Sequence, residues 1–451
     1  MRMLSWNRKT DLVMANAIPL THNRILHIAI PVVLANITVP LLGLVDTGVV
    51  GQMGQAAPIG AVGIGAVILT ALYWVFGFLR MGTTGFAAQS RGAGDVDETS
   101  AIFIRALGIG VLGGLAIIAF QAPLFRLGFW LSPASPEVET LAYSYMATRV
   151  WSAPFLIGTY AVTGWLVAAE RTRAILVIQL LMNGTNIGLD ILFVLGFGWG
   201  VQGVAIATVF AEIVGCLVGL WYCRDGVRLD ILRDHARLFD AAKLRRFASV
   251  NVDILVRSLF LQAIFMSFLF FGARYGDTRL AANHILLQFL TFTAYAMDGF
   301  AFAAESLVGQ AIGQKNRAAF RRACIMVSKW CFAIGVCLAL VFGVAGGAII
   351  DLMTTAPDVR TAARGFLVYM ALTPFLSAAP FMLDGIFIGA TRTRDMRNMM
   401  ALSAVFYLVA ALALMPLLGN HGLWLALLIS FAARGATLAA RYPALERSIG
   451  R

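Results

Sequence analysis

Long, mostly apolar segments recur along the whole chain, and they limit what it can fold into. A membrane-spanning helix needs about 20 predominantly apolar residues. The apolar residues in these segments are continuous rather than alternating, which disfavours a transmembrane β-barrel. The sequence therefore predicts an all-α integral membrane protein with twelve spans. We place the spans at residues 25–51, 58–88, 97–122, 140–170, 172–195, 200–222, 247–274, 279–310, 319–345, 359–391, 396–418 and 422–441.

Composition supports the membrane class and excludes others. The chain is 60% hydrophobic and 13% charged, whereas a soluble protein carries about 25% charged residues. Its net charge is +12. An excess of basic residues is typical of the cytoplasmic loops of membrane proteins, so we expect the lipid bilayer, and no nucleic acid, as a partner. The five cysteines are odd in number and form no Cys-x-x-Cys pair. With no phosphate-binding glycine loop and no HExxH motif either, we expect no metal ion, no cofactor and no enzyme activity.

Charges in the loops predict the orientation. The loop after the sixth span is rich in basic residues, namely Arg224, Arg228, Arg233, Arg237, Lys243, Arg245 and Arg246. The other even-numbered loops are also basic, whereas the odd-numbered loops hold few basic residues, such as Arg126, Arg274 and Arg279. The positive-inside rule then places both termini in the cytoplasm. An even number of spans requires the same arrangement, and we expect a multi-pass protein of the inner (plasma) membrane.

An internal repeat divides the chain. GWLVAAERTR begins at Gly164 and GIFIGATRTR begins at Gly385, 221 residues later. Six spans separate the copies, so both halves enter the membrane in the same direction and form two parallel-repeat lobes. The expected divisions are an N-terminal tail, a first lobe, a cytoplasmic linker, a second lobe and a C-terminal tail, at residues 1–24, 25–222, 223–246, 247–441 and 442–451.

Asp46 is the ionisable residue that most needs an explanation. It lies in the first span, in the stretch NITVPLLGLVDTGVVG, with no other charged residue nearby. A charge at the centre of a membrane helix costs about 2.5–3.5 kcal/mol, so Asp46 must face protein or water. Burial disfavours the charged form of a carboxyl group, which favours a proton-coupling role over a structural one. Pro31 and Pro40 precede it on the same helix and are expected to kink it.

Further polar residues lie on the fifth and sixth spans. Asn183, Asn186 and Asp190 are spaced i, i+3, i+7, which places them on one helical face. We expect them to hydrogen-bond with Asp46. Thr208 lies on the sixth span, and Glu212 follows four residues later near the expected cytoplasmic end, where a structural role is favoured.

The second half carries different acidic residues. Asp298, Glu305 and Asp384 align with Gly77, Thr84 and Thr163 at the repeat offset, so the lobes share architecture but not ionisable groups. We expect these three acids to be polar or substrate-contacting residues of the second lobe. Asp253 and Arg257 are four apart and are expected to form an intrahelical ion pair. Arg80 and Arg149 are candidate counter-ions for buried acids.

Four segments of the chain form a recognisable set, namely NITVPLLGLVDTGVVG, LRMGTTGFAAQ, LTFTAYAMDGFAFAAE and LDGIFIGATRTRDMRN. In these segments the chain resembles the multidrug and toxic compound extrusion (MATE) family, in particular its DinF branch. The resemblance extends from about Ile25 to Ala440. It implies a twelve-helix antiporter that exports organic compounds in exchange for protons or sodium ions.

The family's functional residues can be carried over position by position. Its first-helix aspartate and kinking proline correspond to Asp46 and Pro31. Its fifth-helix pair and its sixth-helix threonine correspond to Asn186, Asp190 and Thr208. The acidic pair of the sodium-coupled branch does not occur, since serines, Ser267 and Ser377, lie near the expected positions. This difference favours protons as the coupling ion, with sodium as the alternative.

Three functions remain open from the sequence. The first is a monomeric proton-coupled exporter of small organic substrates that are cationic or amphipathic. The second is a lipid or glycolipid flippase of the same superfamily. The third, a membrane-embedded enzyme, is disfavoured because no nucleophile with a neighbouring base is recognisable in the sequence.

Overall fold

The computed structural model of the chain describes residues 19–52, 55–132 and 134–450. Within these ranges the regular secondary structure is entirely helical. Twelve helical segments of this described part are long and apolar enough to cross a membrane. The all-α class and the twelve spans expected from the apolar segments are therefore confirmed.

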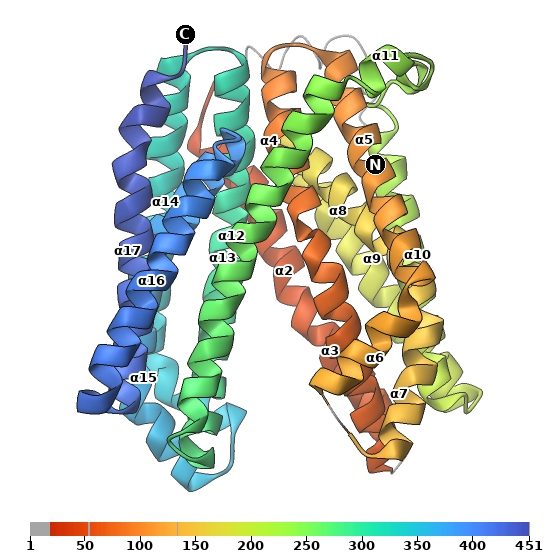
Figure 1. Cartoon of the computed structure of the whole chain (residues 1–451), viewed down its shortest axis with the longest axis vertical. Coiled ribbons are helices and arrows are strands. Elements are labelled where there is room, and N and C mark those ends of the chain that lie inside the picture. The colour runs from red at the N-terminus through yellow and green to blue at the C-terminus, as the bar shows by residue number, and fades with distance from the viewer. Residues whose placement is uncertain (1–18, 53–54, 133, 451) are drawn as a thin grey trace. The chain divides into compact units, whose positions relative to one another are not determined.

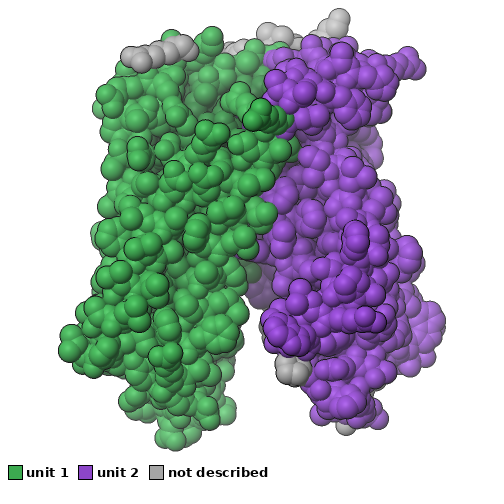
Figure 2. Space-filling view, in the orientation of Figure 1, with its two compact units in different colours: residues 1–33, 88–94, 245–451 green, residues 34–87, 95–244 purple. Residues whose placement is uncertain are grey.

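The chain forms two compact units, which Figure 2 shows in different colours. Unit 2 holds residues 34–87 and 95–244, and unit 1 holds the described residues up to Val33, residues 88–94 and those from Arg245 onward. The beginning of the first spanning helix and the end of the second thus belong with the second half of the chain, although the sequence analysis places them in the first lobe.

Glycine residues explain why residues 88–94 belong to unit 1. A Cβ atom added to Gly92 would lie 2.1 Å from the backbone oxygen of Gln310, and one added to Gly313 would lie 2.0 Å from that of Gln89. Only glycine permits backbones to approach this closely. The Gln89 side chain also donates to the Gly389 carbonyl at 2.8 Å. These contacts join residues that are more than two hundred positions apart in sequence.

Unit 2 is built from the first six spans, apart from the described residues up to Val33 and residues 88–94 (Figure 1). Short 3₁₀ segments interrupt two of these spans, so each of the two consists of two helices with a short connecting turn. The helices are α2 (His22–Gly51), α3 (Ala56–Trp74), η1 (Val75–Gly77), α4 (Phe78–Gly92), α5 (Val96–Ala119), α6 (Gln121–Leu131), α7 (Pro136–Arg149), η2 (Val150–Ser152), α8 (Ala153–Ala168), α9 (Thr172–Asp190), η3 (Ile191–Gly196) and α10 (Gly200–Cys223). Within the unit α9 packs along α10, and α5 packs along α8.

The basic segment after the sixth span folds back onto α5. It contains η4 (Leu229–Arg233) and α11 (His235–Leu238). Arg105, which is buried in α5, donates through Nε to the Leu238 carbonyl at 2.9 Å. Lys243 forms an ion pair with Glu98 at 2.6 Å, and Arg228 forms one with Asp97 at 2.9 Å. Most of the segment expected to be a linker is therefore held against unit 2.

Unit 1 contains the last six spans (Figure 1). The seventh helix begins at Ala241, inside the expected linker, and the last helix extends to Arg447, beyond the expected end at residue 441. The helices are α12 (Ala241–Ala273), α13 (Asp277–Gly313), α14 (Arg317–Met353), α15 (Pro357–Gly389), α16 (Thr393–Leu418) and α17 (Asn420–Arg447). Their core includes the fully buried Phe268 and Trp424, whose ring centroids are 4.6 Å apart.

Backbone geometry confirms the internal repeat. Glu170 and Thr391, which are 221 residues apart, both have a positive φ, at 58° and 52°. Residues other than glycine rarely adopt this conformation. Asp95 and Asn316 are also equivalent positions, and each accepts a hydrogen bond from the backbone N–H three residues later, at 2.8 and 2.9 Å. Equivalent turns and helix caps in the two halves cannot be explained by a shared glycine- and alanine-rich composition alone.

Candidate functional site

One polar face of α9 forms the centre of the candidate site. Asn183, Asn186 and Asp190 are buried, with exposed fractions of 6%, 0% and 0%. The i, i+3, i+7 spacing predicts a shared face, and the structure buries all three side chains inside unit 2. An amide and a carboxylate in such a place need hydrogen-bond partners, which come from α2 and α10.

Asn186 joins the two aspartates. Its amide satisfies all its neighbours when the nitrogen faces the carboxyl groups, so that Nδ2 donates to Asp46 Oδ1 at 2.9 Å and to Asp190 Oδ2 at 3.1 Å. The amide oxygen then faces the Thr208 hydroxyl at 3.3 Å. Thr208 Oγ1 also lies 2.9 Å from the Val204 carbonyl. Four residues predicted from the sequence therefore form one connected network.

The two aspartates of this network also contact each other. Asp46 and Asp190 are close enough for a hydrogen bond between their side chains. Such a bond requires one of the two carboxyl groups to carry a proton, because an ionised carboxylate only accepts hydrogen bonds. Asp190 Oδ1 is buried and has no hydrogen-bond partner among the residues the structure describes. The pair can therefore hold one proton and has an acceptor position for a second.

The backbone changes its winding at Asp190. The residue ends α9, and the next six residues form η3, a turn of π-helix. Its i→i+5 pattern is seen in the bond from the Phe197 N–H to the Leu192 carbonyl, at 3.0 Å. Single π-helical turns are rare and occur frequently at functional sites. Gly196 ends this turn and Gly198 follows it, but the sequence analysis did not detect this feature.

Asn183 lies on the same face but binds elsewhere. Its amide nitrogen donates to the Thr38 carbonyl of α2 at 3.1 Å, and its oxygen accepts from Gln179 at 3.0 Å. The Thr38 hydroxyl in turn donates to the Ala35 carbonyl at 2.7 Å. Asn183 therefore connects α9 to the backbone of α2, about one α9 turn from Asn186 and two from Asp190.

The two prolines predicted to kink the first span both lie within α2. The helix is continuous from His22 to Gly51, and the boundary between the two units falls after Val33, between Pro31 and Pro40. Each proline removes one backbone hydrogen bond. A bend at these residues remains a prediction.

A second polar group lies beside the first in unit 2. Arg149, at the end of α7, forms an ion pair with Glu212 of α10 at 3.3 Å and donates to the Tyr145 hydroxyl at 2.9 Å. Arg149 also interacts electrostatically with Asp46. The role of Arg149 as a counter-ion is confirmed. Glu212 is 5% exposed and lies near the middle of α10, not at the helix end where the sequence analysis placed it.

The sequence analysis missed the tyrosines of this group. Tyr145 is completely buried, and the buried hydroxyl of Tyr73 has no hydrogen-bond partner among the described residues. A helical spacing signal was present, because Tyr145 lies four residues before Arg149. It could not be recognised while the partner of Arg149 was unknown.

The predicted pair between Asp253 and Arg257 does not form. Asp253 instead accepts from Arg397 of α16 at 2.6 Å and from Thr393 at 3.1 Å. Arg257 forms an ion pair with Asp384 of α15. Both residues are buried against other helices. An ion pair between two helices satisfies one charge on each of them. An i, i+4 pair between Asp253 and Arg257 would instead leave Arg397 and Asp384 without these partners.

Asp384 also pairs with Arg434 of α17. Its Oδ2 accepts from two guanidinium groups, and all three residues are 3–7% exposed. The carboxylate is therefore occupied, which favours a structural role over substrate contact. Of the other two second-lobe acids, Glu305 is buried at 1% exposure and Asp298 is half-buried. Contact of these two residues with a substrate remains a prediction.

Comparison with known proteins agrees with this architecture. The family model described as MatE matches residues 31–192 and 254–413, one segment in each half. DNA damage-inducible protein F of Escherichia coli (strain K12) is 36% identical over 419 residues, which cover 92% of this chain and 90% of that protein. A probable multidrug resistance protein NorM of Shewanella oneidensis is 22% identical over 425 residues, with coverages of 90% and 91%.

Solved structures share the same fold. The crystal structure of the Vibrio cholerae MATE transporter VcmN in the bent form has a TM-score of 0.86 with this chain, at 19% sequence identity, and the alignment covers 98% of this chain and 99% of VcmN. At this identity the likeness establishes the arrangement of the helices and does not assign roles to residues.

Proposed function

Because the chain belongs to the MATE family of transporters, we propose that it is a secondary active exporter that exchanges small organic substrates for protons by alternating access. The observation that carries the coupling part is the network of Asp46, Asn186, Asp190 and Thr208. Intramembrane acids mark ion or proton pathways by default. Two relatives at similar length carry names that refer to multidrug resistance, which supports export of organic compounds.

The charge of the unit 2 site supports antiport of protons against organic cations. The site contains three carboxyl groups, from Asp46, Asp190 and Glu212, and one guanidinium group, from Arg149. With one proton shared by the aspartates its net charge is −1, which favours a cationic or amphipathic substrate. A second proton brings the net charge to zero and removes that attraction. Loading a proton therefore favours release of the substrate, as an exchange mechanism requires.

Sodium is the alternative coupling ion, and one observation supports it. Asp190 Oδ1 is buried without a hydrogen-bond partner among the described residues, and a carboxylate oxygen is a ligand for hard cations. Protons are favoured, however, because serines, Ser267 and Ser377, lie near the positions expected for the acidic pair of the sodium-coupled branch.

Transport in everted membrane vesicles tests this function. We expect the wild-type protein to accumulate a fluorescent organic cation such as ethidium when the lumen is acidic, and not when only a sodium gradient is imposed. Asp46→Asn keeps the shape of the protonated form but cannot release a proton, so uptake is expected to fall to background. The control is Asp358→Asn, which changes an exposed carboxyl group at the start of α15.

Two results would contradict the proposal. Full uptake by well-expressed Asp46→Asn protein would remove Asp46 from the coupling mechanism. Uptake driven equally by a sodium gradient alone would assign sodium as the coupling ion. We further propose that both termini lie in the cytoplasm, on the basis of the basic even-numbered loops. We also propose that the protein functions as a monomer in the inner membrane.

A further inference from the structure

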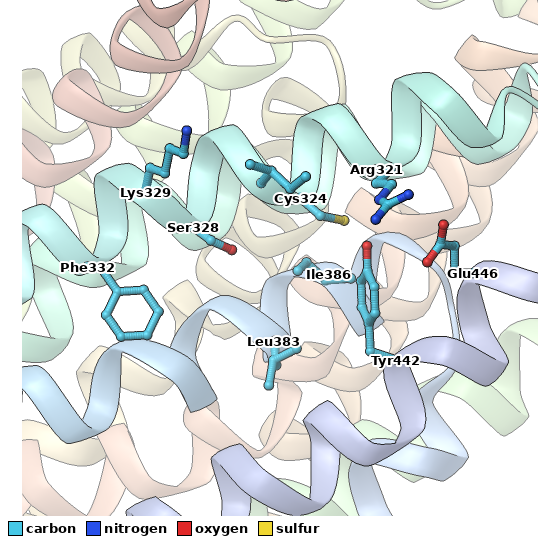
Figure 3. A pocket seen from close by; sticks show the side chains of 10 residues that line it. Arg321, Cys324, Ser328, Lys329, Phe332, Leu383, Ile386, Tyr442 and Glu446 are labelled. Carbon is cyan, nitrogen blue, oxygen red and sulfur yellow. The ribbon is translucent and has the colours of Figure 1, made fainter.

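Two pockets of unit 1 contain basic side chains, and they differ in how these charges are arranged. In the pocket between α14, α15 and α17, Arg321 lies at the end near Glu446. Lys329 lies toward the other end, where Phe332 is (Figure 3). The two basic residues are eight positions apart on α14, roughly 12 Å at 1.5 Å per residue. Their charges are therefore spread along the length of that pocket.

The other pocket lies between α12 and α16 and gathers its charges more closely. It has a volume of about 550 Å³, which is in the range of about 300–1,000 Å³ of known ligand pockets. Three arginines line it, Arg245, Arg394 and Arg397, together with one acid, Asp253. The side chains that line this pocket therefore have a net charge of +2.

The acid and one of the arginines already neutralise each other. Asp253 on α12 is buried, and its Oδ1 accepts from Arg397 of α16 at 2.6 Å. Its Oδ2 accepts from the Thr393 hydroxyl at 3.1 Å, so both carboxylate oxygens are occupied. The surplus charge of the pocket is therefore that of the other two arginines.

The bonded pair also shows which side chains lie at the same level. α12 and α16 both begin after loops expected to be cytoplasmic, so earlier residues on either helix lie nearer to that side. Ser249 precedes Asp253 by four residues, and therefore lies roughly 6 Å nearer to the cytoplasm. Arg394 precedes Arg397 by three residues, which is roughly 5 Å. Ser249 and Arg394 thus form one layer of the pocket, and Arg245 lies one further turn out on α12.

The two surplus arginines are available to a ligand. Arg245 and Arg394 are both exposed, and neither side chain forms an ion pair with any residue that the structure describes. Two positive charges therefore line the pocket without a balancing carboxylate. They disfavour the organic cations proposed as transport substrates and complement an anion.

Apolar side chains follow each arginine on the same helical face. Val252 lies seven residues after Arg245, and Val405 lies eleven residues after Arg394, which is close to two and three full turns. The two valines are 54% and 57% exposed. The eleven residues on α16 correspond to roughly 16 Å, about half of the roughly 30 Å hydrocarbon core of a bilayer. A lipid with its headgroup at the arginines would therefore have apolar helix surface beside its acyl chains.

The expected orientation indicates the leaflet. The predicted spans begin at residues 247 and 396, two residues after Arg245 and Arg394, so both arginines lie at the cytoplasmic edge of the membrane. That side of a membrane carries the anionic lipids, and basic pockets between membrane helices bind their headgroups.

We propose that the pocket between α12 and α16 binds the headgroup of an anionic phospholipid of the cytoplasmic leaflet. Arg394 and the Ser249 hydroxyl hold the phosphate, and Arg245 lies beside the rest of the headgroup. One acyl chain lies along Val252 toward the middle of the bilayer. The assignment of the leaflet rests on the orientation proposed above, whereas binding of the lipid is independent of both orientation and transport.

The test titrates phosphatidylglycerol, or phosphatidylcholine with the same acyl chains, into the purified full-length protein in detergent. Native mass spectrometry measures the lipid bound at each concentration. We expect one phosphatidylglycerol to bind about tenfold more tightly than phosphatidylcholine, in line with two basic residues at an anionic lipid. The double variant Arg245→Gln/Arg394→Gln is expected to bind phosphatidylglycerol no better than phosphatidylcholine.

Two further variants separate the pocket from general surface charge and from misfolding. Ala248→Phe narrows the pocket, which Ala248 lines, without changing its charge, and is expected to weaken phosphatidylglycerol binding several-fold. Arg233→Gln/Arg322→Gln removes two exposed arginines that do not line the pocket, and is expected to bind as the wild type does.

Three results would overturn the proposal. The first is equal phosphatidylglycerol binding by the wild type and the Arg245→Gln/Arg394→Gln variant. The second is an equal loss of binding in the Arg233→Gln/Arg322→Gln control, which would show that general surface charge attracts the lipid. The third is displacement of phosphatidylglycerol by millimolar inorganic phosphate, which would assign the pocket to a soluble anion.

Discussion

Replacing Asp384 with asparagine tests whether the charged cluster of unit 1 holds its helices together. Asp384 on α15 accepts hydrogen bonds from Arg257 on α12 and from Arg434 on α17. The side chains of Asp384, Arg257 and Arg434 are 9%, 9% and 4% exposed. The cluster carries a net charge of +1, and Asp384→Asn raises this to +2 in a buried place. Two guanidinium groups then face an amide that is uncharged and itself carries donors.

The magnitude follows from burial. Removing one partner of a buried ion pair costs about 3–5 kcal/mol, and here both remaining partners are buried. For Asp253→Asn the expected cost is smaller, about 1–3 kcal/mol for a lost hydrogen bond to a charged group, because the side chain of its partner Arg397 is 36% exposed and solvated. A whole domain is stable by only about 5–15 kcal/mol, so Asp384→Asn removes a large fraction of this stability.

The assay is thermal denaturation of the purified protein in detergent, followed by the loss of the monodisperse fraction. The control is the exposed Asp358 on the same helix, whose change to asparagine should leave Tm within error. A second variant, Asp384→Asn/Arg434→Met, returns the cluster to +1 with an apolar side chain of similar length. We expect it to recover part of the loss in Tm.

Two outcomes would refute this reasoning. A Tm for Asp384→Asn equal to that of the Asp358 control would show that the cluster contributes little to stability. A double variant less stable than Asp384→Asn alone would show that excess positive charge is not the cause. Strong loss of transport with an unchanged Tm would return Asp384 to the set of substrate-contacting candidates.

Two other predictions concern packing and orientation. Gly92→Ala should lower the free energy of unfolding by about 1–3 kcal/mol through overpacking, because the added Cβ would lie 2.1 Å from the Gln310 backbone oxygen. Gly108→Ala should raise it by up to about 1 kcal/mol through helix propensity, because its added Cβ would meet nothing within 4 Å. Equal Tm shifts of the two variants would contradict this account of the packing. Cysteines placed at Asp230 and Ser135 in a cysteine-free background should react with an impermeant maleimide from opposite sides of the membrane, and labelling from one side only would refute the predicted orientation.

The amino-acid sequence determined the fold class because the signals for membrane helices are local. Each span is a continuous apolar segment, and backbone groups in lipid must be satisfied within the segment itself. The polar face of α9 is also a local signal, since Asn186 and Asp190 share it through helical periodicity alone. Asp46 and Thr208 were recognisable because a polar residue in an apolar span is costly and because the chain resembles a known family.

Only the tertiary structure decided which of these groups are partners. Asp253 and Arg257 have the spacing of an intrahelical pair, yet each binds a residue on another helix, more than one hundred positions away. Arg149, at the end of α7, likewise forms an ion pair with Glu212 on α10. A buried charge binds whichever opposite charge the packed helices bring within a few ångströms. That distance depends on how each helix is rotated and tilted, which the packing of all the side chains sets together and no single segment encodes.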